Sequence, residues 1–405
     1  MDNNIIDEKQ LDEEQSGVLS QISPFRIMLA AFIGLAVVVY MFISEFDAKE
    51  FGKIEWSSHV FIWIGMAMFF MCFRHFCYMV RLRIITDGFF SWKKAFELVM
   101  MWEFSSAVTP TSVGGAAVAM FAIAQEKLSA GKTAMIVLYT VVVDTFSFLS
   151  ALFIFYMIYG AIMVQPGASN WSELMGTKWG IGFVTAYGLM LFYGGLFFYG
   201  VLINAKGVQK FLLFLCKIPF LKRFREKAIQ MTDEMALASS ELRKKNWSFH
   251  VGTYLSTMAA WASRFMVLNC LIIAFVAYSP NVEVQQYYQS FMGGEMGFGA
   301  FQQQVFIYAR QQAMYVIMAV MPSPGGAGVA EYAFKTFHND YIPTAETGIA
   351  VAGTLMVIMA TLWRTFTYYV YLLVGAIVVP NWVNKIIKRN KAERLAAMQK
   401  GNITL

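Results

Sequence analysis

Six uninterrupted apolar stretches constrain this chain more than any other feature. They lie at about 26–44, 59–80, 133–160, 180–203, 247–278 and 348–379. Each meets or exceeds the roughly 20 helical residues that are needed to cross a bilayer. Composition agrees, because 58% of the residues are apolar and 14% are charged, against about 45–50% and about 25% in soluble domains. The sequence therefore predicts an all-α polytopic membrane protein with about six full transmembrane helices.

Two further apolar segments are interrupted near their middles by clusters of proline and glycine. Segment 95–124 breaks at T-P-T-S-V-G-G, and segment 301–337 breaks at S-P-G-G-A-G. As a helix, residues 95–108 would rise about 21 Å, which passes the bilayer midplane but does not cross the bilayer. Each segment is therefore predicted to be either a re-entrant hairpin or a broken full span.

The distribution of Lys and Arg decides between these two alternatives. Loop 81–94 carries four, loop 204–246 carries ten and the tail after Pro380 carries six, whereas loop 161–179 has one and loop 279–300 has none. The positive-inside rule places the basic segments in the cytoplasm. The assignments agree only if both interrupted segments are re-entrant, the first entering from the cytoplasm and the second from outside. The two would then form an inverted repeat, as in many transporters.

This topology divides the chain into five parts and places both termini in the cytoplasm. The parts are a disordered acidic tail (1–25), a first membrane half (26–203), a basic linker (204–246), a second membrane half (247–380) and a basic tail (381–405).

Ionisable residues inside the predicted spans and hairpins are the main candidates for function, because such residues are costly in a membrane. They are Glu103, Asp144, Arg264, Arg310, Glu331 and Arg364. Three arginines and three acids can pair off as purely structural ion pairs. Alternatively, the arginines hold a phosphate, since guanidinium stays charged and matches phosphate geometry. The acids would then orient the arginines, receive a cationic headgroup or relay protons.

Soluble catalytic chemistry has little support in the sequence. No Walker loop, dinucleotide fingerprint, G-x-S-x-G or H-E-x-x-H motif occurs. The four histidines and four cysteines lack metal-ligand spacing, so no metal and no cofactor are expected. The net charge of +6 belongs to the predicted cytoplasmic face of the membrane, so nucleic acid is not expected as a partner.

Three motifs resemble a known family. Residues 322–331 (P-S-P-G-G-A-G-V-A-E) and 362–375 (L-W-R-T-F-T-Y-Y-V-Y-L-L-V-G) are similar to signatures of the lysylphosphatidylglycerol synthase transmembrane family. T-P-T-S-V-G-G at 109–115 resembles its first-half Pro/Gly motif, and Asp144 lies where the family carries an acid. The family is flippase-like and is related to the N-terminal membrane domain of the multiple peptide resistance factor. The resemblance runs over roughly residues 26–380.

The resemblance implies a protein that binds a phospholipid or polyprenyl-phosphate lipid and moves it between leaflets. It adds the two hairpin breaks to the embedded charges as substrate-binding candidates. These additions are Thr109, Pro110, Gly114, Gly115, Pro324, Gly325, Gly326 and Gly328. The chain departs from the family at Val118–Met120 and Val141–Val143, where many relatives carry an arginine. Only 25 residues follow Pro380, too few for the soluble aminoacyltransferase domain of full-length synthases, so no enzyme activity is expected.

The leading hypothesis is thus a lipid flippase or lipid-binding transporter of a bacterial-type inner (cytoplasmic) membrane. It would handle an anionic phospholipid or polyprenyl-phosphate headgroup at the tips of two re-entrant hairpins. Three alternatives stay open at this point. They are a secondary transporter of a small anion or amino compound, a non-catalytic membrane partner of a lipid-modifying enzyme, and an intramembrane enzyme. The sequence is compatible with a monomer or an oligomer.

Overall fold

The computed structural model describes residues 43, 47–109, 112–319 and 329–399, and throughout these ranges the chain is helical, without β-strands. The α-helices are α3 (Ala48–Phe51), α4 (Ser58–Ile85), α5 (Trp92–Val108), α6 (Ser112–Ala124), α7 (Ala130–Tyr159), α8 (Trp171–Met175), α9 (Lys178–Phe198), α10 (Ala205–Leu215), α11 (Arg225–Leu242), α12 (Trp247–Ile272), α13 (Val282–Gln289), α14 (Ala300–Ala319), α15 (Val329–His338), α16 (Ala352–Arg364) and α17 (Val370–Gln399). Short π-helical turns extend several of them, at Tyr199–Ile203, Ile273–Ala277, Ser290–Glu295 and Thr365–Tyr369.

Five of the helical stretches are long and apolar enough to cross a membrane. They are Ser58–Ile85, Ala130–Met163, Lys178–Ile203, Trp247–Ala277 and Ala352–Ile386. These stretches confirm the all-helical membrane architecture and five of the predicted crossings. The sixth predicted crossing, 26–44, lies almost entirely outside the described residues, so the total number of spans stays a prediction.

Polar residues just before the helices explain where several of them begin. Ser91, Ser129 and Asn246 each accept a hydrogen bond from a backbone N–H in the first turn of α5, α7 and α12 respectively. Such side chains satisfy N–H groups that have no partner within the helix. Each long apolar run therefore starts at a defined residue, which fixes the register of the side chains that it carries.

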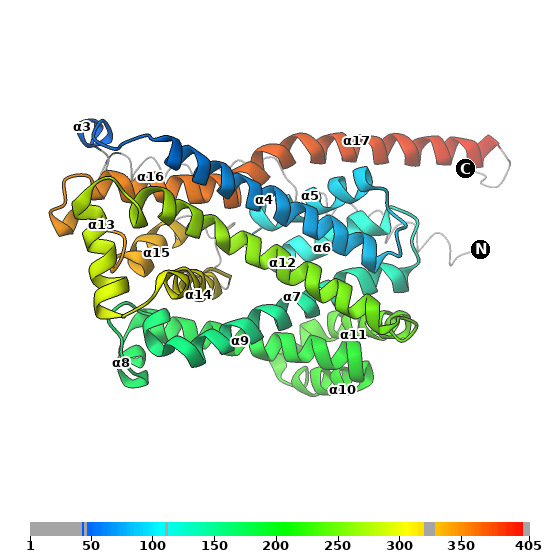
Figure 1. Cartoon of the computed structure of the whole chain (residues 1–405). Helices are drawn as coiled ribbons and strands as arrows, with labels where there is room; N and C mark the ends of the chain where they lie inside the picture. The colour runs from blue at the N-terminus through cyan, green and yellow to red at the C-terminus, as the bar shows by residue number, and fades with distance from the viewer. Residues whose placement is uncertain (1–42, 44–46, 110–111, 320–328, 400–405) are drawn as a thin grey trace.

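The long helices run between two ends of the bundle (Figure 1). α11 and most of α17 lie at one end, on the right in the figure. Near them Lys245 binds Asp87 at 2.5 Å and Lys385 of α17 binds Glu97 at 3.1 Å. At the other end, the Tyr287 hydroxyl donates to the carbonyl of Asn339 at 2.5 Å. The basic segments identified in the sequence thus gather at a single end of the bundle.

Each interrupted segment forms two α-helices that pack on each other. α5 and α6 pack on each other, and Lys94 in the first turn of α5 binds Glu126, just past α6, at 3.1 Å. α14 and α15 also pack together, and Arg310 on α14 binds Asp340 just past α15. The connecting residues 110–111 and 320–328 lie outside the described part of the chain.

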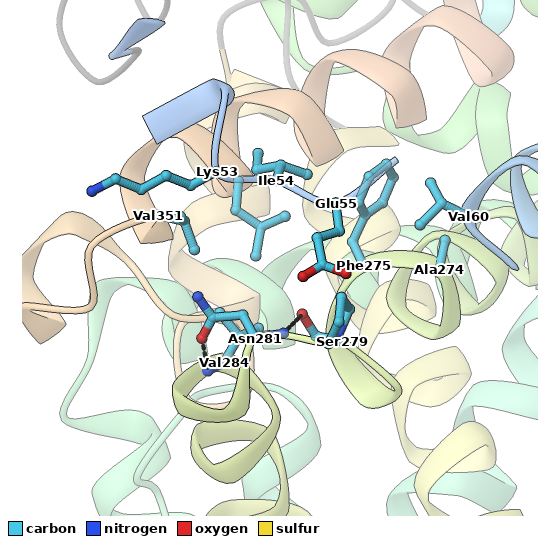
Figure 2. A pocket seen from close by; sticks show the side chains of 12 residues that line it. Lys53, Ile54, Glu55, Val60, Ala274, Phe275, Ser279, Asn281, Val284 and Val351 are labelled. Carbon is cyan, nitrogen blue, oxygen red and sulfur yellow. Dashed lines mark hydrogen bonds between the residues drawn. The ribbon is translucent and has the colours of Figure 1, made fainter. Parts of the chain in front are cut away.

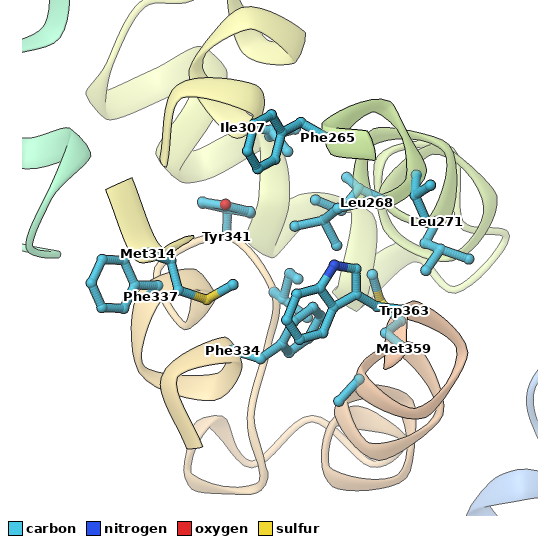
Figure 3. Close-up of a cluster of buried hydrophobic side chains, with 14 of the residues drawn as sticks. Phe265, Leu268, Leu271, Ile307, Met314, Phe334, Phe337, Tyr341, Met359 and Trp363 are labelled. Atoms are coloured by element: carbon cyan, nitrogen blue, oxygen red, sulfur yellow. The ribbon is translucent and has the colours of Figure 1, made fainter. Parts of the chain in front are cut away.

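The two helix pairs are packed in separate hydrophobic cores. The α14–α15 core also contains residues of α12 and α16, and Figure 3 shows Phe334 of α15 beside Trp363 of α16, with Phe265 of α12 further away in the same cluster. The α5–α6 core contains the first half of α7, residues of α11 and the tyrosine Tyr368. α4 and α12 are long enough to contribute to both cores.

Candidate functional site

Embedded charges lie where the two cores meet. On α4, Arg74 lies between Met71 of the α14–α15 core and Cys77 of the α5–α6 core. On α7 and α12, Asp144 and Arg264 occupy the corresponding boundary positions. These charges, with Glu103 of α5, are called the polar belt below. The charges at this boundary lie between the two cores and not inside either of them. Neither core therefore has to hold one of these charges.

The belt on the α5 side is organised by Arg74. Its guanidinium is 2.8 Å from the Glu103 carboxylate and donates to the Tyr371 hydroxyl at 2.6 Å. The same guanidinium lies 4.7 Å from the centre of the Tyr78 ring. Arg74 is almost fully buried, whereas 19% of the Glu103 side chain is exposed. This pair therefore joins α4, α5 and α17 while leaving its carboxylate accessible.

A second ion pair lies two helical turns further along α4. Arg81 contacts Asp144 of α7 at 2.6 Å and Thr257 of α12 at 3.3 Å. The indole N–H of Trp261 donates to the same Asp144 oxygen at 3.0 Å. Asp144 thus has two donors, and 24% of its side chain is exposed.

Sequence reasoning placed Arg81 in a cytoplasmic loop, and the structure corrects this. α4 continues to Ile85, which brings Arg81 into the span. Arg74, Tyr78 and Arg81 are spaced by four and three residues, so they share one face of the helix. That spacing was visible in the sequence and would have predicted a second embedded pair.

The α14–α15 side carries two further pairs, and both are more completely enclosed. Arg310 is fully buried, binds Asp340, and donates to the carbonyls of Phe337 (3.2 Å) and Ile162. Arg364 contacts Glu331 at 2.8 Å, with 2% and 1% of the two side chains exposed. Asp340 was missed in the sequence because it lies beyond the end of α15, where no helical spacing links it to Arg310.

Contacts around Arg364 bring the inner ends of the two helix pairs together. Glu331 is the third residue of α15, and Ala107 is the next-to-last residue of α5. Tyr368 connects them, since its hydroxyl donates to the Ala107 carbonyl at 3.3 Å and its ring lies 4.2 Å from the Arg364 guanidinium. Tyr368 belongs to the π-helical turn Thr365–Tyr369, and such turns are frequent at functional sites.

Arg264 differs from the other embedded arginines. Among the described residues it has no carboxylate within ion-pair distance and no hydrogen bond. Its guanidinium lies 4.9 Å from the centre of the Tyr315 ring on α14, a cation–π contact. It also interacts electrostatically with Glu103 and Tyr371. The side chain is partly buried, near the middle of the span Trp247–Ala277. Among the described residues Arg264 therefore has no ion-pair partner, and the Glu103 carboxylate acts on it only at longer range.

The remaining predicted site residues lie at or near the breaks. Thr109 ends α5 and its hydroxyl donates to the Ser105 carbonyl at 2.7 Å. Gly114 and Gly115 lie in the first turn of α6. A methyl group on Gly115 would be 2.1 Å from the Ser106 oxygen, so this glycine permits close packing of α5 on α6. Pro110, Pro324, Gly325, Gly326 and Gly328 lie outside the described residues.

The larger cavity lies away from these charges, at the end of the bundle opposite the basic loops. It has a volume of about 110 Å³ and lies between the residues after α3, the end of α12 and α13 (Figure 2). Glu55, Ser279 and Asn281 supply its polar lining, and none of the predicted site residues contributes. A smaller cavity of about 20 Å³ lies beside Arg81 and is lined by residues of α4, α5, α6 and α7. It has room for about one water molecule.

Five membrane-length helices, buried ion pairs and two broken helix pairs define a multi-pass α-helical membrane protein. The chain belongs to the family described as the lysylphosphatidylglycerol synthase TM region, which it matches over residues 27–284. It is also similar to a UPF0104 membrane protein of Archaeoglobus fulgidus, at 23% identity over 370 residues, covering 87% of this chain and 95% of the relative. No solved structure matches the chain.

These comparisons confirm the family that the sequence motifs indicated. The family match ends before residues 322–331 and 362–375, although these motifs carried much of the resemblance. The similarity to the archaeal protein covers too much of the chain to end at residue 284, so it extends into the second membrane half. The family is a transmembrane region by description and carries no named catalytic domain.

Proposed function

We propose that this protein is a lipid-binding transporter that holds an anionic lipid headgroup at Arg264. In the simplest form of this proposal, the protein is a lipid flippase. The two helix pairs α5–α6 and α14–α15 are re-entrant hairpins that enter the bilayer from opposite sides. The headgroup is the phosphate of a phospholipid or a polyprenyl-phosphate lipid. We assign the protein no enzymatic step.

One observation carries this proposal, namely that Arg264 has no carboxylate within ion-pair distance in the part of the chain that the structure describes. Each of the other embedded arginines, Arg74, Arg81, Arg310 and Arg364, contacts a carboxylate. Among the described residues, Arg264 is left without such a partner. The two segments that join the helix pairs, 110–111 and 320–328, contain no acidic residue that could serve. A mobile anion is therefore the natural counter-charge for Arg264.

Phosphate suits this position better than a carboxylate or a neutral headgroup. Arginine offers several donors in a fixed planar arrangement that matches phosphate oxygens. A charge near the bilayer centre is costly unless it is paired or hydrated. A bound phosphate would lower the free-energy cost of burying the Arg264 charge. Binding of the phosphate and burial of Arg264 would therefore favour each other.

The positions of the hairpins give the headgroup access from either leaflet. α5 has 17 residues, which span about 25 Å and so reach past the midplane of a bilayer with a core about 30 Å thick. Arg264 contacts Tyr315 of the second hairpin and interacts electrostatically with Glu103 of the first. Movement of either hairpin would therefore change the surroundings of Arg264 from one side of the membrane.

Native mass spectrometry of the purified protein in membrane-derived nanodiscs tests this function. We expect a phosphate-bearing lipid to be retained by the wild type and reduced about tenfold or more in R264Q. The matched control is R243Q, because Arg243 is an exposed arginine at the end of α11. Equal retention in R264Q, or no retained anionic lipid in the wild type, would overturn the proposal. Retention of a soluble anion instead would identify a small-anion transporter.

A further inference from the structure

Helix α10 occupies an unusual place for part of a linker between two membrane halves. It begins at Ala205, directly after the π-helical end of the span Lys178–Ile203. Asn204 caps it by accepting a hydrogen bond from the Gly207 N–H at 3.0 Å. The chain turns at Asn204, and α10 packs on α11 and on the π-helical turn Tyr199–Ile203 (Figure 1).

A ring contact fixes the depth of α10 along the span. Phe211 of α10 meets Phe192 of α9, with ring centroids 6.4 Å apart. Phe192 is 60% exposed on a membrane-length helix, so its ring belongs to the surface that faces lipid. Phe192 precedes the end of the span by 11 residues, or about 16 Å of helix. The Phe211 side of α10 therefore faces the exposed surface of the second half of the span.

The surface of α10 combines exposed aromatic side chains with a row of lysines. Phe211 and Phe214 are 42% and 64% exposed, while Ala205 and Val208 pack against the protein. Lys206, Lys210 and Lys217 are all exposed. Lys206 and Lys210 are four residues apart and share one face of α10, and Lys217 lies in the turn that follows the helix.

We infer that α10 is an in-plane amphipathic helix of the cytoplasmic leaflet, whose lysines bind anionic lipid headgroups. Aromatic side chains of such a helix enter the acyl boundary, and basic side chains extend toward phosphates. The occupant is lipid because the apolar face of α10 continues the lipid-facing surface of α9 through the Phe192–Phe211 contact. This surface acts independently of Arg264, so it goes beyond the function proposed above.

The depth of residue 214 tests the inference directly. A nitroxide on F214C, in full-length protein whose four native cysteines are replaced, is placed in phosphatidylcholine nanodiscs with added phosphatidylglycerol. We expect its accessibility to oxygen, relative to a water-soluble nickel complex, to exceed several-fold that of a reporter at E226C, an exposed site on α11. Equal values at the two sites would overturn the inference and would leave this face for a protein partner.

The lysines are tested by lipid selectivity. A fluorophore at position 214 is quenched by spin-labelled phosphatidylglycerol or by spin-labelled phosphatidylcholine, and the ratio reports preference for the anionic lipid. We expect K206Q/K210Q/K217Q to lower this preference about fivefold or more, since one basic residue near an anionic surface contributes about that factor. The control K227Q/R243Q/K244Q removes the same charge from exposed α11-side positions. An equal loss in both variants would overturn the role of the α10 lysines.

R264Q separates the two proposals. We expect it to leave both readouts at position 214 unchanged, while it removes the lipid retained at the central site. A change at position 214 in R264Q would contradict the independence of α10.

Discussion

The two hairpins use the same kind of ion pair in different surroundings. In the α14–α15 region, Arg364 and Glu331 are 2% and 1% exposed. In the α5–α6 region, the acids Glu103 and Asp144 keep 19% and 24% of their side chains exposed. An enclosed pair fixes helices in place, whereas a pair with an accessible carboxylate can exchange partners. The comparison predicts that breaking the pair on the α14–α15 side costs more stability than breaking the pair on the α5–α6 side.

The largest expected effect comes from breaking the enclosed pair. E331Q leaves the Arg364 charge buried without its carboxylate, and we expect a loss of about 3–5 kcal/mol in the free energy of unfolding. Unfolding in mixed micelles measures it. E331M/R364M, which removes both charges, should recover most of that loss. A cost of E331Q no larger than that of E103Q would contradict the difference between the two hairpins.

A smaller effect is expected at the accessible pair. E103Q leaves Arg74 with the Tyr371 hydroxyl as an acceptor, and the Glu103 side chain is 19% exposed, against 1% for Glu331. We expect a loss of about 1.5–3 kcal/mol, typical of one hydrogen bond to a charged group. The same unfolding measurement checks it, and Y371F/E103Q should cost more than the sum of the single changes, because both replace acceptors of one guanidinium.

Helix packing within the first hairpin gives the next prediction. A methyl group at Gly115 would clash with the Ser106 oxygen at 2.1 Å and with its Cα at 2.9 Å. We expect G115A to destabilise the protein by about 1–3 kcal/mol, as overpacking does. The control is G65A on α4, where nothing lies within 4 Å of the added methyl. Equal thermal stability of the two variants in detergent would show that α5 and α6 can separate freely.

The smallest effect is expected at Trp261. W261F removes the indole donor to Asp144, but Arg81 remains bound to that carboxylate. We expect a loss of about 0.5–1.5 kcal/mol, the usual net value of one hydrogen bond. A much larger loss would mean that Asp144 depends on Trp261 as strongly as Glu331 depends on Arg364.

The sequence predicted the elements of the fold well because the signals were long and repetitive. Five apolar runs reappear as membrane-length helices, and the basic loops gather at one end of the bundle. Of the pairing predicted among the six embedded charges, one pair appears, because Arg364 meets Glu331. Glu103, Asp144 and Arg310 bind partners outside that set. The re-entrant placement and the lipid ligand stay predictions.

The choice of partners could not be read from the sequence. Arg310 and Arg264 are both arginines in apolar surroundings, and nothing local distinguishes them. The first finds Asp340 in a loop, and the second finds only the Tyr315 ring in cation–π contact. Such pairings depend on how helices far apart in the chain dock. Arg81 is different, because its helical spacing from Arg74 was a local signal.

The division of the interior into two cores has a consequence for motion. The polar belt interrupts apolar packing at the level of Arg74, Asp144 and Arg264, and α4 and α12 run through both cores. Proteins open in cooperative units that follow their packing boundaries. Each core would then open as one cooperative unit. α4 and α12, which run through both cores, would bend at the polar belt, where the two units meet. Amide exchange should therefore fall into two classes, divided within single helices at these charged residues.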